Sequence, residues 1–132
     1  MTANKMGRLR AGAAAGAAVA IVLVAGVAAL PAAAADAEHG KVVFQNCAAC
    51  HTDKPDAIGP SLRGVYGRKS AALADFHYSN AMLRANLTWD DANLHAYIKD
   101  PQAKVKGNRM PFGGLNKPED IDDVIAFLKT YQ

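Results

Sequence analysis

Cys47-Ala48-Ala49-Cys50-His51 contains both cysteines of this 132-residue chain. Two cysteines separated by two residues and followed at once by histidine form the C-x-x-C-H pattern of covalent haem attachment. Thiols three positions apart on one helical turn can each add to a haem vinyl group, while the next residue offers an imidazole to the iron. The motif therefore predicts one haem c, attached through Cys47 and Cys50, with His51 as an iron ligand.

Three other kinds of site could use the same two cysteines. A structural disulfide would leave His51 without a role, and a thioredoxin-like redox pair needs a βαβ context that the sequence does not show. Zinc needs a fourth ligand and usually a second pair of ligands, which the spacing of His39, His77 and His95 does not supply. Haem is the interpretation that uses every functional side chain of the motif.

The start of the chain differs in composition from the rest. Lys5, Arg8 and Arg10 precede an uncharged apolar run over residues 11–30, and a string of alanines follows. A basic start, an apolar centre and a small-residue end are typical of a secretory signal peptide. Residues 1–35 are therefore predicted to direct export.

The point of cleavage is predicted from the alanines. Cleavage after Ala35, with Ala33 also in a small-residue position, would leave a mature domain over residues 36–132. The apolar run is longer than the ~7–15 residues of a usual signal centre and close to the ~20 that cross a bilayer, so an uncleaved membrane anchor is the alternative. Covalent haem attachment in bacteria takes place outside the cytoplasm. We therefore expect a periplasmic protein, or one anchored in the membrane and facing the periplasm.

The leader also accounts for the net charge. The whole chain has 15 Lys and Arg against 12 Asp and Glu, and the three basic residues of the leader make up the excess. The mature part is neutral overall and has no basic cluster with interleaved aromatic residues, which argues against nucleic acid as a partner. Its length suits one small domain and is too short for two.

Apolar spacing predicts helices, because no segment alternates apolar and polar residues with a period of two. One set of residues falls at i, i+3, i+4 and i+7 and would share a helical face: Gly40, Val43, Phe44 and Cys47. A second set repeats that spacing near the C-terminus: Ile121, Val124, Ile125 and Leu128. Pro118 followed by two acids predicts the start of this last helix, because proline needs no amide partner in the first turn.

A third helix is predicted between these two. It would begin at Thr88, where Asp91 three residues on approximates a capping box. It would end near Asp100, because Pro101 follows. The remaining segments are rich in Gly, Pro, Asn and Ser and are predicted to be loops.

The mature chain resembles class I c-type cytochromes over essentially its whole length. The resemblance is carried by Gly40 and Phe44, Gly59-Pro60-Ser61-Leu62-Arg63-Gly64, Gly67-Arg68-Lys69, Phe76, Tyr78, Trp89, Tyr97, Pro101, Asn108-Arg109-Met110-Pro111-Phe112 and the final amphipathic helix. It implies a small all-α cytochrome c fold in which three to five helices wrap around one covalent haem. It also implies that the first and last helices cross, with Gly40 letting the backbones approach and Phe44 packing near Val124 and Phe127.

The resemblance further implies that Met110 is the sixth ligand of the iron. Pro111 lacks an amide donor and blocks a helix, so this segment can be held extended against the haem. Met82, the other methionine of the mature part, lies in Asn80-Ala81-Met82-Leu83, where core packing is the better interpretation. The histidines other than His51 are interpreted as surface or hydrogen-bonding residues.

Residues around the two ligands acquire roles by the same resemblance. The carbonyl of Pro60 would accept the proton of the haem histidine ring and fix its orientation. Tyr97 would hydrogen-bond the sulfur of Met110. The sequence departs from the mitochondrial form at Asn108, where threonine is usual, and at Pro111, which leaves the hydrogen bonding near the methionine open.

Contacts with the haem propionates are implied for Arg68, Tyr78 and Trp89. Arg68 matters most among them, because a buried propionate charge is costly unless it is paired. Each of the three residues could instead be a plain packing or surface residue.

The implied ligand pair decides what the iron could do. Imidazole and thioether together leave no vacant position for a substrate, and the soft thioether favours Fe(II), which raises the reduction potential. We therefore expect a monohaem electron carrier, not an enzyme. One rival is a haem peroxidase or nitrite-handling enzyme, which needs a labile or absent Met110. Another is a membrane-tethered cytochrome domain within a respiratory complex, which needs the leader to be retained.

Charges are segregated along the mature chain. Cations precede the methionine (Lys99, Lys104, Lys106 and Arg109), and acids gather at the start of the last helix (Glu119, Asp120, Asp122 and Asp123). Such a dipole would turn the exposed haem edge towards acidic partners, although a lysine-rich segment is usually just a solvated loop. The expected partners are redox proteins, namely an oxidase, a cytochrome bc1-type complex, a reaction centre or another reductase. A membrane is a partner only if the leader is retained.

Overall fold

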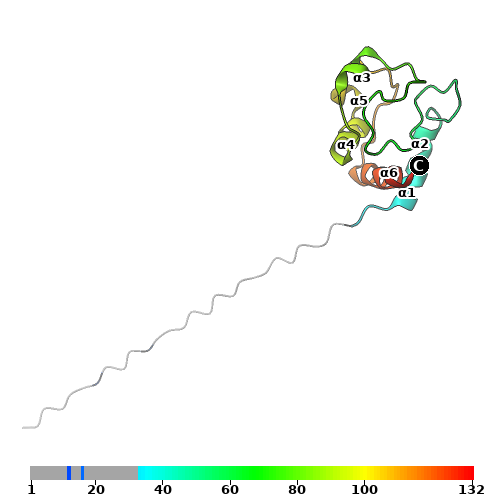
Figure 1. Ribbon diagram of the computed structural model, residues 1–132. Coiled ribbons are helices and arrows are strands. Elements are labelled where there is room, and N and C mark those ends of the chain that lie inside the picture. The colour runs from blue at the N-terminus through cyan, green and yellow to red at the C-terminus, as the bar shows by residue number, and fades with distance from the viewer. Residues whose placement is uncertain (1–11, 13–15, 17–32) are drawn as a thin grey trace, which may run out of the picture. The chain divides into compact units, whose positions relative to one another are not determined.

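The computed structural model describes residues 33–132, together with Gly12 and Gly16 (Figure 1). Most of the predicted leader therefore lies outside the described residues. None of the helices in the described part of the chain has the length and apolar character needed to cross a membrane.

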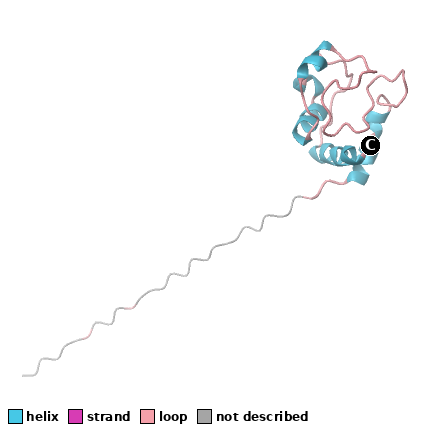
Figure 2. Cartoon of the chain, in the orientation of Figure 1, coloured by secondary structure: helices cyan, strands magenta, loops and turns pink. Residues whose placement is uncertain are grey.

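Helices and the loops between them make up residues 33–132 (Figure 2). The helices are α1 (Ala37–Val43), α2 (Gln45–Ala48), α3 (Asn80–Ala85), α4 (Asp91–Lys99), α5 (Pro101–Lys104) and α6 (Pro118–Thr130). Within this range there is no strand, only an isolated antiparallel bridge between Lys69 and Thr88. The all-α prediction is confirmed, with more helices in this range than the three to five expected. α2 was predicted as part of the first helix, and α3 and α5 lie in segments that were predicted to be loops.

The first and last helices pack closely against one another, as predicted. A Cβ atom built on Gly40 would lie 1.9 Å from the carbonyl oxygen of Asp123, so only glycine allows this approach of α1 to α6. The ring centroids of Phe44 and Phe127 are 5.0 Å apart, and the Phe44 ring lies equally close to that of Tyr131. Burial of these apolar faces is the main favourable contribution to the pairing.

The predicted first helix is divided at Phe44, which caps both α1 and α2. Phe44 keeps helical dihedral angles (φ −57°, ψ −21°), and its amide donates to the Gly40 carbonyl at 2.8 Å. The amide of Ala48 donates to the Phe44 carbonyl at 2.9 Å. The helical path is thus nearly continuous, and Cys47 still follows Phe44 by one turn.

The predicted start of the third helix is wrong by about two residues. α4 is capped by Asp90, whose carboxylate accepts from the amide of Asn93 at 2.8 Å. Thr88 cannot serve as the cap, because its backbone is held in the bridge to Lys69. The predicted end is confirmed: α4 stops at Lys99, and the chain then turns into α5.

α3 was not predicted from the sequence. The hydroxyl of Ser79 caps it by accepting from the amide of Met82 at 3.1 Å, and it ends at Asn86 in a left-handed conformation (φ 48°). Both boundary residues are typical of helix caps, but six residues are too few for a helical period to show. Met82 is 8% exposed, which confirms that it packs in the core.

Candidate functional site

The centre of the domain holds a cavity of about 540 Å³. Its lining includes all nine residues predicted to bind the haem or its iron: Cys47, Cys50, His51, Pro60, Arg68, Tyr78, Trp89, Tyr97 and Met110. Most of the remaining lining is apolar and comes from the core, including Leu94, Val124 and Leu128. The cavity therefore brings together side chains from Cys47 to Leu128, in a setting suited to a large apolar group with a few polar contacts.

Cys47 and Cys50 are not joined by a disulfide in this structure. Both are partly buried at the end of the α1–α2 segment. Burial, with a smaller contribution from Cys50, raises the pKa of Cys47 to about 11. The unmodified thiol is consequently neutral at pH 7 and compatible with an apolar cavity wall.

His51 is held in one orientation by its neighbours. Its Nδ1 lies 2.7 Å from the carbonyl oxygen of Pro60. A carbonyl only accepts, so Nδ1 carries the proton and Nε2 keeps a free lone pair. Burial lowers the pKa of His51, which favours the neutral ring that a metal requires. A Cβ on Gly59 would lie 2.5 Å from Cε1 of the ring, so the glycine makes room for the imidazole.

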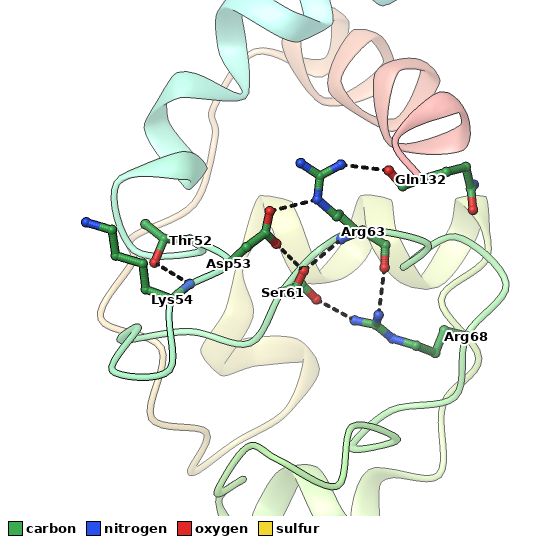
Figure 3. Close-up of polar contacts among 7 residues, drawn as sticks. All are labelled: Thr52, Asp53, Lys54, Ser61, Arg63, Arg68 and Gln132. Atoms are coloured by element: carbon green, nitrogen blue, oxygen red, sulfur yellow. Dashed lines mark hydrogen bonds and ion pairs between the residues drawn. The ribbon is translucent and has the colours of Figure 1, made fainter.

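Arg68 is a partly buried cation whose hydrogen bonds go to neutral groups (Figure 3). Its Nη1 donates to the Arg63 carbonyl at 2.9 Å, and its Nη2 donates to the Ser61 carbonyl at 2.8 Å. Arg63, by contrast, is paired with Asp53, whose Oδ2 accepts from its Nε at 2.7 Å. Burial lowers the pKa of Arg68, with a smaller opposing effect of Tyr78. None of the ion pairs within residues 33–132 involves Arg68. The cavity wall thus offers a fixed cation to an anionic group.

Aromatic rings form the wall next to Arg68. Trp89 is buried, and its ring centroid lies 5.0 Å from that of Tyr97. Burial raises the pKa of Tyr97 to about 12 and also raises the pKa of Tyr78, so both phenols remain protonated at neutral pH and can donate hydrogen bonds. The predicted hydrogen bond from Tyr97 to the Met110 sulfur stays a prediction, as do the propionate contacts.

These residues fit a covalent haem. Two adjacent thiols can form thioethers, a neutral imidazole and a methionine can ligate iron, and a half-buried arginine can pair with a propionate. Among the described residues, no three His, Cys, Asp or Glu side chains converge to hold a bare metal ion.

The family model described as cytochrome c matches residues 37–132. The chain belongs to the cytochrome c family. It accordingly carries covalently bound haem c with its iron, and proteins of this family are electron carriers rather than enzymes. The match starts one residue after the first residue of the predicted mature domain.

Similar proteins come from several bacteria. Cytochrome c2 of Afifella marina is 46% identical over 98 residues, covering 70% of this chain and 79% of that one. Cytochrome c2 of Blastochloris viridis is 41% identical over 113 residues, covering 83% and 87%. The solved structure of cytochrome cH from Methylobacterium extorquens is 43% identical with a TM-score of 0.68, covering 72% of this chain and 98% of that one.

Some relatives are longer than this cytochrome. The cytochrome c homolog of Rickettsia typhi is 41% identical over 100 residues, which are 74% of this chain but 57% of the relative. The chain therefore spans little more than half the length of that relative.

Sequence reasoning missed two features of the site. Asn108 is the buried polar residue of the described part, and its presence in the cavity lining was not foreseen. His77, interpreted as a surface residue, is exposed but also contributes to the rim of the cavity. The available signal for Asn108 was its place two positions before Met110, the predicted ligand, but its burial depends on how the loop folds.

Proposed function

We propose that this cytochrome is a monohaem electron carrier whose iron is ligated by His51 and Met110. The observation that carries the proposal is that one cavity is lined by both residues together with Cys47 and Cys50. When bound, the haem supplies an iron that takes up and releases one electron. His51 and Met110 would hold that iron with two uncharged ligands and leave it no position for a substrate.

The protein side chains set the properties of the site. The carbonyl of Pro60 keeps the proton of His51 on Nδ1. Nε2 is then unprotonated and could bind the iron without a change of tautomer. The apolar lining keeps water away, which disfavours the more highly charged ferric state, and the thioether acts in the same direction. Both effects favour a high reduction potential.

Charged side chains favour acidic redox proteins as partners. The cations of the α4–α5 region and the loop after it (Lys99, Lys104, Lys106 and Arg109) form no ion pair with an acid within residues 33–132. Two of the acids at the start of α6 already contact histidines: Asp123 lies 2.7 Å from His39, and Asp122 lies 3.8 Å from His95. The unpaired cations would steer acidic surfaces such as those of an oxidase, a cytochrome bc1-type complex or a reaction centre.

Export to the periplasm is part of the proposal, with cleavage after Ala35. Residues 33–36 are exposed, and Asp36 is the cap of α1, so the helical domain begins where the leader would end. The alternative, a retained anchor, differs in mass by residues 1–35. Intact mass of the exported protein distinguishes the two forms.

Covalent attachment and ligation are tested on the purified protein. Haem should remain with the polypeptide after denaturing electrophoresis and acid-acetone extraction, because thioethers through Cys47 and Cys50 survive both. The ferric form should show the thioether-to-iron charge-transfer band. Complete extraction of the haem would contradict the attachment, and absence of the band would contradict the ligand pair.

A further inference from the structure

Asn108 lies two residues before Met110 and is 7% exposed. Its side-chain amide makes three hydrogen bonds. Nδ2 donates at 2.8 Å to the carbonyls of Pro101 and Val105, and Oδ1 accepts from the amide of Met110 at 2.8 Å. The side chain thus uses both of its donors and its acceptor, which is what burial of an amide requires.

The two carbonyls that Asn108 holds belong to the ends of α5. Pro101 is the first residue of this helix and is almost completely buried, and Val105 is its C-terminal cap with 6% exposure. The loop is braced a second time by Gln102, whose Nε2 donates to the Asn108 carbonyl at 2.9 Å and whose Oε1 accepts from Gly107 at 3.2 Å. The anchor for the methionine loop is therefore a fixed part of the core.

The three hydrogen bonds of Asn108 are not equivalent. The Pro101 carbonyl also accepts from the Val105 amide at 2.9 Å, and the Val105 carbonyl accepts from the Asn108 amide at 3.1 Å. Both carbonyls would keep one partner if Nδ2 were lost. The amide of Met110 is different, because Oδ1 of Asn108 is its acceptor within the described residues. Losing Oδ1 would leave a partly buried N–H unpaired, which is the costlier change.

We propose that Asn108 is the positioning residue for the ligand Met110, tying the methionine backbone to α5 so that the thioether is presented to the haem iron in one arrangement. The inference rests on the proposed function, in which Met110 ligates the iron. The role uses two donors for the carbonyls of Pro101 and Val105 and one acceptor for the Met110 amide. Asparagine has all three, whereas threonine has a single donor, aspartate has none, and leucine has a similar shape without any polar group.

The test compares Asn108→Leu, Asn108→Thr and Asn93→Leu in the haem-loaded protein. Asn93 in α4 is the matched control: its Nδ2 donates to the Thr88 carbonyl at 2.9 Å, and it is not among the residues that line the cavity. Three properties are measured, namely the ferric charge-transfer band, the rate of cyanide binding to the ferric protein, and the midpoint of urea unfolding. Met110→Ala is measured alongside.

Asn108→Leu should weaken the band and speed cyanide binding about tenfold to a hundredfold, because an unpaired Met110 N–H favours opening of the loop. Asn108→Thr should lie between this variant and the wild type. Asn93→Leu should lower the unfolding midpoint and leave band and rate unchanged. If Asn108→Leu does not mature with haem, the band and the cyanide rate of Asn108→Thr are compared with those of the wild type and Asn93→Leu instead.

Two outcomes would overturn the inference in different ways. A band that survives in Met110→Ala would show that methionine is not the ligand, and the proposed ligation would then be wrong together with the inference. A band lost in Met110→Ala but unchanged in both Asn108 variants, with the cyanide rate also unchanged, would leave the ligation intact. Asn108 would then be a purely structural residue.

Discussion

The backbone nitrogen of Asp36 donates to Oδ1 of Asp123 at 2.6 Å. This contact joins the first residue of the predicted mature domain to α6, across 87 positions of sequence. The other carboxylate oxygen of Asp123 lies 2.7 Å from Nδ1 of His39. Asp123 therefore connects the start of α1 to the last helix through both of its oxygens.

Cleavage after Ala35 would turn the Asp36 amide into an α-ammonium group next to Asp123. We expect the cleaved protein to be more stable than a variant that keeps one extra alanine, by about twofold to fivefold in the folding equilibrium constant at low salt. The gain should shrink as salt is added. Urea unfolding of the two forms measures it.

Asp123→Asn is the partner variant for this comparison. It should remove the difference between the cleaved and extended forms, whereas Asp122→Asn, one position away, should preserve it. A difference that persists in Asp123→Asn would show that the ammonium group acts through another residue.

The contact between His39 and Asp123 predicts a dependence of stability on pH. The hydrogen bond to Asp123 raises the pKa of His39 above its ordinary 6.5, and the bond from the Asp36 backbone, with a smaller one from His39, lowers the pKa of Asp123 below 3.8. The histidine contribution is thus complete below about 6.5 and is lost as pH rises through the folded-state pKa. The aspartate contribution is complete above about 3.8 and is lost as pH falls below it.

His39→Gln should therefore destabilise the protein more at pH 5.5 than at pH 8.5. Urea unfolding at the two pH values measures this difference, and Glu38→Gln is a control on the neighbouring position. An equal loss at both pH values would mean that His39 contributes by packing or neutral hydrogen bonding alone.

Gly40→Ala should destabilise the domain strongly. The added Cβ would meet the Asp123 carbonyl oxygen at 1.9 Å, and a backbone atom cannot rotate away. Overpacking costs about 1–3 kcal/mol or more, against about 1 kcal/mol that alanine gains in helix propensity. Thermal unfolding should show a net loss for Gly40→Ala, while Gly113→Ala, with nothing within 4 Å of its Cβ, should stay close to the wild type.

The parts of the fold that the sequence predicted are those with local signals. The helical apolar periods of α1 and α6 are such signals, because burial imposes them, whereas the crossing of the two helices at Gly40 was implied by the resemblance to class I c-type cytochromes. α3 has six residues and shows too little of a period. The start of α4 was displaced from Thr88 because a bridge to Lys69, nineteen positions away, holds its backbone.

The same distinction applies to the site. A five-residue motif was enough to predict the roles of Cys47, Cys50 and His51. The carbonyls that accept from Arg68, and the side-chain oxygen of Asn108 that accepts from the Met110 amide, are placed by how loops fold in space. Local sequence does not encode these contacts in a readable pattern. The sequence showed that Asn108 stands where the mitochondrial form usually has threonine, but it did not show that this side chain is buried and hydrogen-bonds the Met110 amide.

Met110→Ala should convert the carrier into a weak enzyme. Haem should stay attached, because Cys47, Cys50 and His51 are unchanged, but the ferric charge-transfer band should disappear. Loss of the thioether opens an iron position, so cyanide or carbon monoxide should bind faster and peroxidase activity should appear. The reduction potential should fall, because water or a nitrogen base stabilises Fe(III) better than a thioether does.

Met82→Ala is the control that separates ligation from packing, because Met82 lines the same cavity and is 8% exposed. It should cost about 2–5 kcal/mol of stability, as expected for a truncated core methionine, and leave the band intact. The two methionines thus predict opposite patterns, one losing the band with the haem retained and the other losing stability with the band retained. If Met110→Ala kept its band, or if Met82→Ala lost it, the iron would have another ligand and its closure to substrates would no longer follow.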